Sequence, residues 1–346
     1  MAMKPGNVSQ TAWRRSVGKQ FHMRHPETVS SLSRESRYAV IENTGDTCTV
    51  CAGASAYGSG GMTAYYAVLE AAGNVASGGA LPTEVSLGIL LPAGSDEEIL
   101  RQTAEGAEAA CRKMNLQAAC VRAEVSPSVS DIIVTAEAAG TAEKTACAGL
   151  KGMRPGQEIL LCGYVALEGT LRIVEEAEEE LKKRFVPSFL DGTKGLAEEL
   201  VTADMIRKAC GLKMTENGGV RPCVTAVRQI GSGGILAALW DMAEMSGTGL
   251  EADMHRMTLR QETVEICEYF QLNPYQMTSS GSFLLAADHA EEVIEVLEKA
   301  GARAGRLGVA RAGRAKVITS GEEVRYLDRP APDELMRWWG TRPVSE

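Results

Sequence analysis

The chain has 346 residues, of which 45% are apolar and 23% charged, the balance of a soluble globular protein long enough for two domains. Its net charge of −9 excludes the general basic surface that attracts nucleic acid. No apolar run reaches membrane-spanning length, and the N-terminus lacks the apolar segment of a signal peptide. We therefore expect a cytoplasmic protein with neither a nucleic-acid nor a membrane partner.

The nine cysteines are an odd number, and most lie inside apolar patterns, as expected of small core residues in a reducing compartment. Cys48 and Cys51 form a C-x-x-C pair, but they fall within an alternating strand pattern and should point to opposite faces. A zinc ribbon would need a second pair. Since the four histidines show no ligand spacing either, we expect no structural metal.

The first half of the chain alternates strand and helix patterns after a polar N-terminal arm, residues 1–30, that holds one short helix. Ser95-Asp-Glu-Glu98 reads as a capping box at the start of a helix. In chain order the patterns predict a hairpin of 38–42 and 47–51 with its turn at 43–46, a helix over 62–74, a strand over 85–91, the helix after residue 95, and a strand over 132–138.

The second half begins after the glycines and proline of 149–156. Its patterns predict a strand over 158–164, helices over 171–185 and 198–210, a strand over 283–287, a helix over 290–300, and a closing hairpin about Ser320-Gly321. Helices and hairpins mixed in both halves favour an α+β fold over a doubly wound one. We place the domains at 31–150 and 151–328, followed by a tail, 329–346, packed by its two tryptophans.

A glycine-rich turn, Gly231-Ser-Gly-Gly234, runs directly into an amphipathic helix. Glycines let the backbone approach another surface closely and leave the first helical N–H groups open, so such a turn can hold an anion. The same pattern also fits a tight turn before a core helix, and a lone glycine-rich turn does not decide between the two.

The sequence around this turn resembles the second domain of the aminoimidazole-ribonucleotide synthase superfamily. The segments that carry the resemblance are 228–247, 260–275 with its Leu272-Asn-Pro-Tyr275 turn, and Thr278-Ser-Ser-Gly-Ser-Phe-Leu-Leu285. The branch it resembles is that of the hydrogenase maturation factor, a carbamoyl dehydratase. The resemblance implies two domains, an N-terminal sheet shared in a homodimer as a barrel, a C-terminal α/β sandwich, and a site for ATP and magnesium.

The chain departs from the family where acids hold the metal. Arg37, Ala54, Asn74 and Gln229 stand at four acidic positions, and Glu124 is the acid left in the loop that also contains Arg122. Magnesium needs carboxylates beside the phosphate oxygens, so these losses weaken an Mg-ATP site. The chain also ends without the cysteine that the dehydratase carbamoylates.

Three of the departures bring arginines, whose guanidinium groups suit phosphate or carboxylate. One hypothesis is that Arg122 and Arg228 converge with open glycine amides on a small anion or nucleotide; the other is that each arginine pairs with a nearby Glu. The candidate site is Arg37, Asn74, Arg122, Glu124, Arg228, Gln229, Gly233 and Gly234. We expect a homodimeric, non-catalytic or metal-independent binding protein, the alternative being an active ATP-dependent synthase or maturation-type enzyme.

Overall fold

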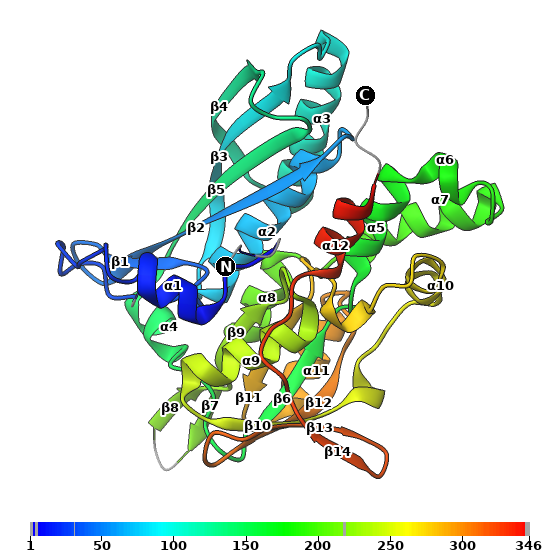
Figure 1. The fold of residues 1–346 in the computed structure, drawn as a ribbon. Coiled ribbons are helices and arrows are strands. Elements are labelled where there is room, and N and C mark those ends of the chain that lie inside the picture. The colour runs from blue at the N-terminus through cyan, green and yellow to red at the C-terminus, as the bar shows by residue number, and fades with distance from the viewer. Residues whose placement is uncertain (1–2, 4–5, 31, 217–218, 343–346) are drawn as a thin grey trace.

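The computed structural model describes residues 3, 6–30, 32–216 and 219–342, and its two halves each contain a sheet with helices (Figure 1). The first sheet has the strand order β1-β2-β5-β3-β4 and the second β14-β13-β10-β12-β6-β11-β9, with a separate β7-β8 hairpin. The predicted α+β class is confirmed. Neither sheet closes into a barrel among the described strands of this one chain.

The first half contains a long central helix, α2, beneath a five-stranded sheet. Its elements are α1 (Gln10–Ser16), β1 (Ala39–Glu42), β2 (Thr47–Gly58), α2 (Thr63–Ser77), β3 (Leu81–Pro92), α3 (Glu97–Met114), β4 (Gln117–Ser126), β5 (Ile132–Glu143) and α4 (Lys144–Gly149). Alternate residues of β2, β3 and β5 are buried against α2 and α3. The other face of this sheet stays open, and β4 is exposed along nearly its whole length.

The second half wraps helices around both faces of its sheet. Its elements are β6 (Glu158–Cys162), α5 (Leu167–Glu176), α6 (Glu178–Leu181), α7 (Pro187–Gly195), η1 (Leu196–Glu199), α8 (Ala203–Cys210), β7 (Lys213–Glu216), β8 (Gly219–Pro222), β9 (Val224–Gln229), α9 (Gly234–Ser246), β10 (Gly249–Asp253), η2 (Met254–Arg256), α10 (Gln261–Tyr269), η3 (Pro274–Gln276), β11 (Phe283–Ala287), α11 (Ala290–Lys299), β12 (Ala304–Arg311), β13 (Lys316–Ser320), β14 (Glu323–Tyr326) and α12 (Glu334–Thr341).

Strands β9 and β11 are buried on both faces, and β6 nearly so. This burial explains the apolar sequences of β11 and β6, whereas β9 ends in two buried polar residues, Arg228 and Gln229. One apolar cluster lies toward α5, α9 and α10, and a second toward α8 and α11. Helix α2 contacts β9 and α8, so it joins the two halves, and 14 of its 15 residues are buried. No helix in the described part of the chain is long and apolar enough to cross a membrane.

Most predicted elements are present, with shifted ends. The predicted helix over 171–185 begins earlier, at Leu167, and breaks at Ala177, where α6 follows. Asp96, not Ser95, caps α3 by accepting a hydrogen bond from the amide of Ile99. Cys48 is buried and Cys51 only partly so, as the alternating pattern predicts.

Candidate functional site

The junction between α2 and β9 brings two of the predicted site residues together. Nε2 of Gln229 donates hydrogen bonds to the carbonyl oxygen of Glu70 at 2.8 Å and to Oδ1 of Asn74 at 3.2 Å. Oε1 of Gln229 accepts one from the amide of Gly281 at 3.3 Å. Both side chains are buried. The positions where the family resemblance implies metal acids therefore form a neutral network between the two halves of the chain.

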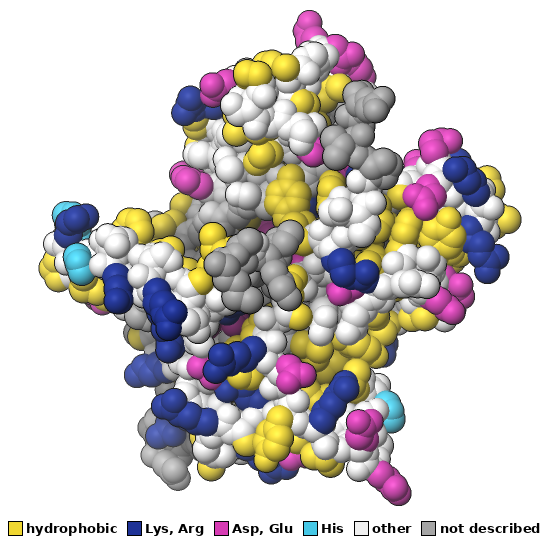
Figure 2. Space-filling view, in the orientation of Figure 1, with side chains coloured by type: hydrophobic (Ala, Val, Ile, Leu, Met, Phe, Trp, Pro, Cys, Tyr) yellow, Lys and Arg dark blue, Asp and Glu magenta, His cyan; other side chains and the backbone are white. Residues whose placement is uncertain are grey.

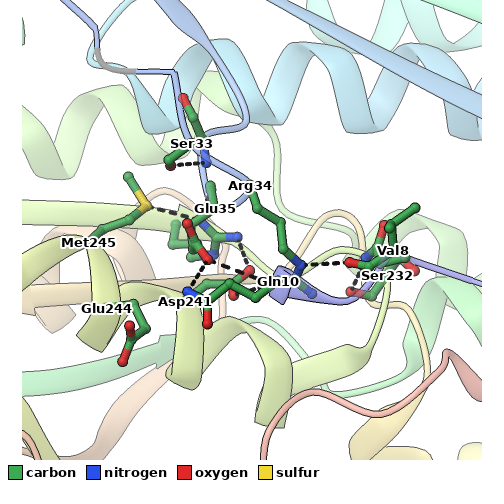
Figure 3. Close-up of polar contacts among 12 residues, drawn as sticks. Val8, Gln10, Ser33, Arg34, Glu35, Ser232, Asp241, Glu244 and Met245 are labelled. Atoms are coloured by element: carbon green, nitrogen blue, oxygen red, sulfur yellow. Dashed lines mark hydrogen bonds and ion pairs between the residues drawn. The ribbon is translucent and has the colours of Figure 1, made fainter. Parts of the chain in front are cut away.

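Arg228, the neighbour of Gln229, is buried and points away from this network. Its Nη2 lies 2.5 Å from Oδ2 of Asp241, and its Nη1 donates to the carbonyl oxygen of Glu35 at 2.8 Å. Arg34 also pairs with Asp241, at 3.2 Å (Figure 3). Burial lowers the pKa of Arg228 to about 10, although Asp241 opposes the shift. The guanidinium group of Arg228 thus binds the Asp241 carboxylate and the Glu35 backbone.

Arg122 and Glu124 lie on the edge strand β4, on the open face of the first sheet. With Gly88 and Thr135 they line a shallow hollow of about 170 Å³. Strands β5 and β3 separate β4 from β2. The expectation that Arg122 and Arg228 aim their guanidinium groups into one groove is therefore wrong, because one is exposed at a sheet edge and the other is buried against α9.

The glycine-rich turn does begin a helix, but its amides are not open. Gly233, with φ of +89°, donates its amide to Oδ2 of Asp333 at 2.5 Å, and the amide of Gly234 donates to the carbonyl oxygen of Gly231 at 3.0 Å. The prediction of open amides at Gly233 and Gly234 is wrong because Asp333, from the tail, caps the turn. Burial raises the pKa of Asp333 to about 7, against the lowering effect of its two backbone hydrogen bonds.

A second glycine-rich turn, Gly58-Ser-Gly-Gly61, precedes α2 and was not singled out from the sequence. Oε1 of Glu176 accepts hydrogen bonds from the amides of Ser59 at 2.7 Å and Gly60 at 3.2 Å. Oε1 of the adjacent Glu175 accepts from Met62 at 3.1 Å, and burial raises the pKa of Glu175 to about 7. The same reasoning that was applied to Gly231–Gly234 would have marked this turn as an anion site, and here too a carboxylate of the chain fills it.

Arg37 lines a cleft of about 500 Å³ beside residues 53–57 of β2. Ala54, Glu70 and Ser232 lie in the same wall. Burial raises the pKa of Glu70, and the nearby Arg37 opposes that shift. The sequence signal that could have found Glu70 is its position four residues before Asn74, which places both on one face of α2.

The C-terminal helix α12 closes the groove beside this cleft. Arg172 of α5 pairs with the buried Glu168 at 3.1 Å and stacks under the Trp339 ring, 5.4 Å from its centroid. Tyr57, at the end of β2, packs edge-on against Trp339 and donates a hydrogen bond to Sδ of Met336 at 2.7 Å. Two segments from opposite ends of the sequence, β2 and α12, thus meet over α5 (Figure 1).

The described residues contain no cluster of three or more His, Cys, Asp or Glu side chains arranged to hold a metal ion. The carboxylates of this region are instead used singly. Each lies against a backbone amide, an arginine or a hydroxyl group, as Asp333, Glu168 and Glu176 show. Chemically, the arrangement can fix the two halves against each other and can present Arg37 and Glu70 to a small polar molecule.

Residues 154–320 match the protein family described as AIR synthase related protein, C-terminal domain. Carbamoyl dehydratase HypE of Rhodobacter capsulatus is 22% identical over 287 residues, covering 80% of this chain and 79% of that relative. The crystal structure of E. coli HypE, 18% identical, has a TM-score of 0.69 and covers 84% of this chain and 88% of that one. A HypE structure in complex with ATP, 17% identical, has a TM-score of 0.63 and covers 94% of this chain and 96% of that one.

Proposed function

Because this chain is an AIR synthase-related protein similar to carbamoyl dehydratase HypE, we propose that it is a non-catalytic homodimer of that family that binds no Mg-ATP. The hydrogen bond between Gln229 and Asn74 carries this proposal. Where a metal site would need carboxylates, two carboxamides satisfy each other. The enzyme alternative requires that these same positions hold a charged ligand.

Magnesium does not fit the residues present. The ion takes an octahedral set of hard oxygens, usually one or two carboxylates with water and phosphate oxygens. Ala54 offers no ligand atom, and Oδ1 of Asn74 and Oε1 of Gln229 are already accepting hydrogen bonds. Binding the ion would break the network that joins α2 to β9. Without the metal, nearby carboxylates repel a triphosphate.

The two glycine-rich turns support the same proposal. A helix N-terminus attracts an anion through its unsatisfied amides. In this chain Asp333 takes that place at Gly233, and Glu176 takes it at Ser59 and Gly60. A phosphate group would have to displace a carboxylate that is attached to the same molecule, whose effective concentration is high. Both turns therefore bind carboxylates of the chain itself and so connect segments that are distant in the sequence.

The cleft beside β2 is the part of the site that suits a ligand. Arg37 lies near the carboxylate of Glu70, and Glu137, Ser55 and Ser232 line the same cleft. Two acids beside one cation do not favour a highly charged anion, but they match a small polar molecule that carries both donors and acceptors.

Isothermal titration calorimetry and thermal melting with ATP test the proposal. We expect neither saturable heat nor a rise in melting temperature, with Mg²⁺ or with EDTA, and phosphate release no faster than in buffer. The Gln229→Ala variant serves as the control, since trace activity from a contaminating ATPase would be the same in both preparations. Mg²⁺-dependent turnover that Gln229→Ala abolishes would instead establish the ATP-dependent enzyme.

A further inference from the structure

A cavity between α1, β1 and α4 shares no residue with the cleft beside β2, and neither the sequence motifs nor the proposed function uses it. It has a volume of about 600 Å³, within the range of small-molecule sites. Three segments distant in the sequence enclose it: the N-terminal arm with β1, helix α4, and the end of α9. Figure 3 shows Gln10, Ser33, Glu35, Glu244 and Met245 along one side of this region.

Apolar side chains form part of the cavity wall, beside polar ones. Tyr38, Val40 and Leu150 line it together with the thiols of Cys48 and Cys147, which lie beside each other. The ring of Tyr38 lies close to Gly78, where an added Cβ would come within 2.8 Å of its Cδ2. Tyr38 therefore presents its ring as a fixed surface, and burial raises the pKa of its hydroxyl group, which keeps that group neutral.

The acidic groups of the wall already have partners. Glu42 pairs with Lys144 at 3.2 Å, and Glu244 pairs with Lys316 at 2.6 Å. Glu35 accepts a hydrogen bond from Gln10 at 3.1 Å and lies 3.9 Å from Arg34. Each of the three carboxylates that line the cavity therefore has a basic or carboxamide partner.

Two basic residues of the rim remain. Arg14 of α1 and Lys151, just after α4, both line the cavity, and neither has an acidic group within 4 Å among the residues that the structure describes. Figure 2 shows Lys and Arg side chains gathered over α1. In a chain with a net charge of −9, a cavity with two uncompensated cations at its mouth selects for negative charge.

We propose that this cavity binds a small organic anion, one carboxylate, sulfonate or phosphate group on a flat apolar body. The charged group lies at the rim between Arg14 and Lys151, and the apolar body lies inward against Tyr38, Val40 and Leu150. The volume accommodates such a molecule but not an extended polymer. This cavity shares no lining residue with the cleft beside β2. A test of the cavity therefore does not depend on whether the chain binds Mg-ATP.

The probe that matches this chemistry is 8-anilino-1-naphthalenesulfonate, whose fluorescence rises in apolar surroundings. We expect saturable binding of one probe per chain, weakened about tenfold or more by Arg14→Ala with Lys151→Ala. The matched control is Lys182→Ala with Lys183→Ala in the exposed turn after α6, which should leave the affinity unchanged. Both pairs remove two exposed cations, so a difference between them reports the cavity and not the net charge.

Thiol labelling shows where the probe binds. Cys147 lines the cavity and is partly exposed, whereas Cys120 is exposed on β4, outside it. With methyl methanethiosulfonate and mass spectrometry at mildly alkaline pH, the bound probe should slow labelling of Cys147 and leave Cys120 unchanged. Equal affinity of the Arg14→Ala/Lys151→Ala protein, absence of saturable binding, or unprotected Cys147 at probe saturation would each overturn the proposal.

Discussion

Gly73 of α2 and Gln229 of β9 fit together because Gly73 has no side chain: a Cβ at Gly73 would lie 1.8 Å from Oε1 of Gln229. Glycine inside a helix costs roughly 0.5–1 kcal/mol relative to alanine. Here that cost is offset by the close approach of a carboxamide held by three hydrogen bonds. The junction between the two halves is therefore shaped around Gln229 itself.

Gly73→Ala should destabilise the protein even though alanine is the better helix former. The new methyl group would displace Gln229 and break its hydrogen bonds, and overpacking of this kind costs about 1–3 kcal/mol. Denaturant unfolding measures the change. Gly192→Ala in α7 is the matched control, since nothing lies within 4 Å of its Cβ position, and it should be neutral or stabilising.

A second substitution tests the cause. In the double variant Gly73→Ala/Gln229→Ala the methyl group has space, so the two effects should not add, and the double variant should be more stable than their sum predicts. Strict additivity would show that Gly73 is needed for some other reason than its contact with Gln229.

Much of the fold could be predicted from the sequence, because the spacing of apolar residues indicates which side chains are buried. It succeeded for α3, the helix predicted after residue 95, one face of which is buried through Thr103, Ala107 and Cys111. It missed β4, because an edge strand exposed on both faces has no apolar alternation to detect. It also misplaced the start of α5 at 171, since the helix begins after Ala166, a residue with φ of +61° that no periodicity announces.

The site was predictable only in part. Asn74 and Gln229, both members of the candidate site, lie within hydrogen-bond distance of each other. Nothing in the sequence says that Asp333, 100 residues further on, caps Gly233. The same holds for Arg228 and Asp241, which are 13 residues apart and on different elements. Such pairings depend on how the elements pack, so an arginine beside a glycine-rich turn cannot be assigned a ligand from its position alone.

Asp333→Asn should flatten the pH dependence of stability between about pH 4 and 7. The pKa of Asp333 rises from 3.8 to about 7 on folding, so in this window the folded chain binds more protons at this group than the unfolded chain. Its contribution is fully present below pH 4 and is lost as the pH rises toward 7. The loss is up to about 4 kcal/mol.

Melting temperatures of both proteins across this range measure the effect. The advantage of the wild type over Asp333→Asn should be largest near pH 4 and should shrink toward pH 7. The control Asp328→Asn removes an exposed carboxylate five residues away and should run parallel to the wild type. A constant difference between wild type and Asp333→Asn at every pH would contradict the raised pKa. Glu175 titrates in the same window in both proteins, so its effect cancels.

Arg228→Ala should be much more harmful to stability than Arg34→Ala. Both arginines pair with Asp241, but Arg228 has side-chain exposure of 7% and also binds the carbonyl oxygen of Glu35. Removing one partner of a buried pair costs about 3–5 kcal/mol, because a charge is left without compensation. Urea unfolding of the two variants compares them directly. Equal losses would mean that Arg34 is as important for Asp241 as Arg228 is.

The homodimer should form through the open face and free edge of the first sheet. Val121 and Val125 are 52% and 56% exposed on β4, four residues apart and so on the same side of the strand. An exposed edge strand with apolar side chains is a template for pairing with another chain. Light scattering should give a dimer for the wild type and a monomer for Val121→Asp/Val125→Asp, because two buried charges would face each other across the interface. The control Val220→Asp/Val324→Asp changes two equally exposed valines of the second half and should leave the dimer intact. A wild-type monomer at micromolar concentration would contradict the homodimer. A dimer that the β4 substitutions leave unchanged would show that the interface lies elsewhere.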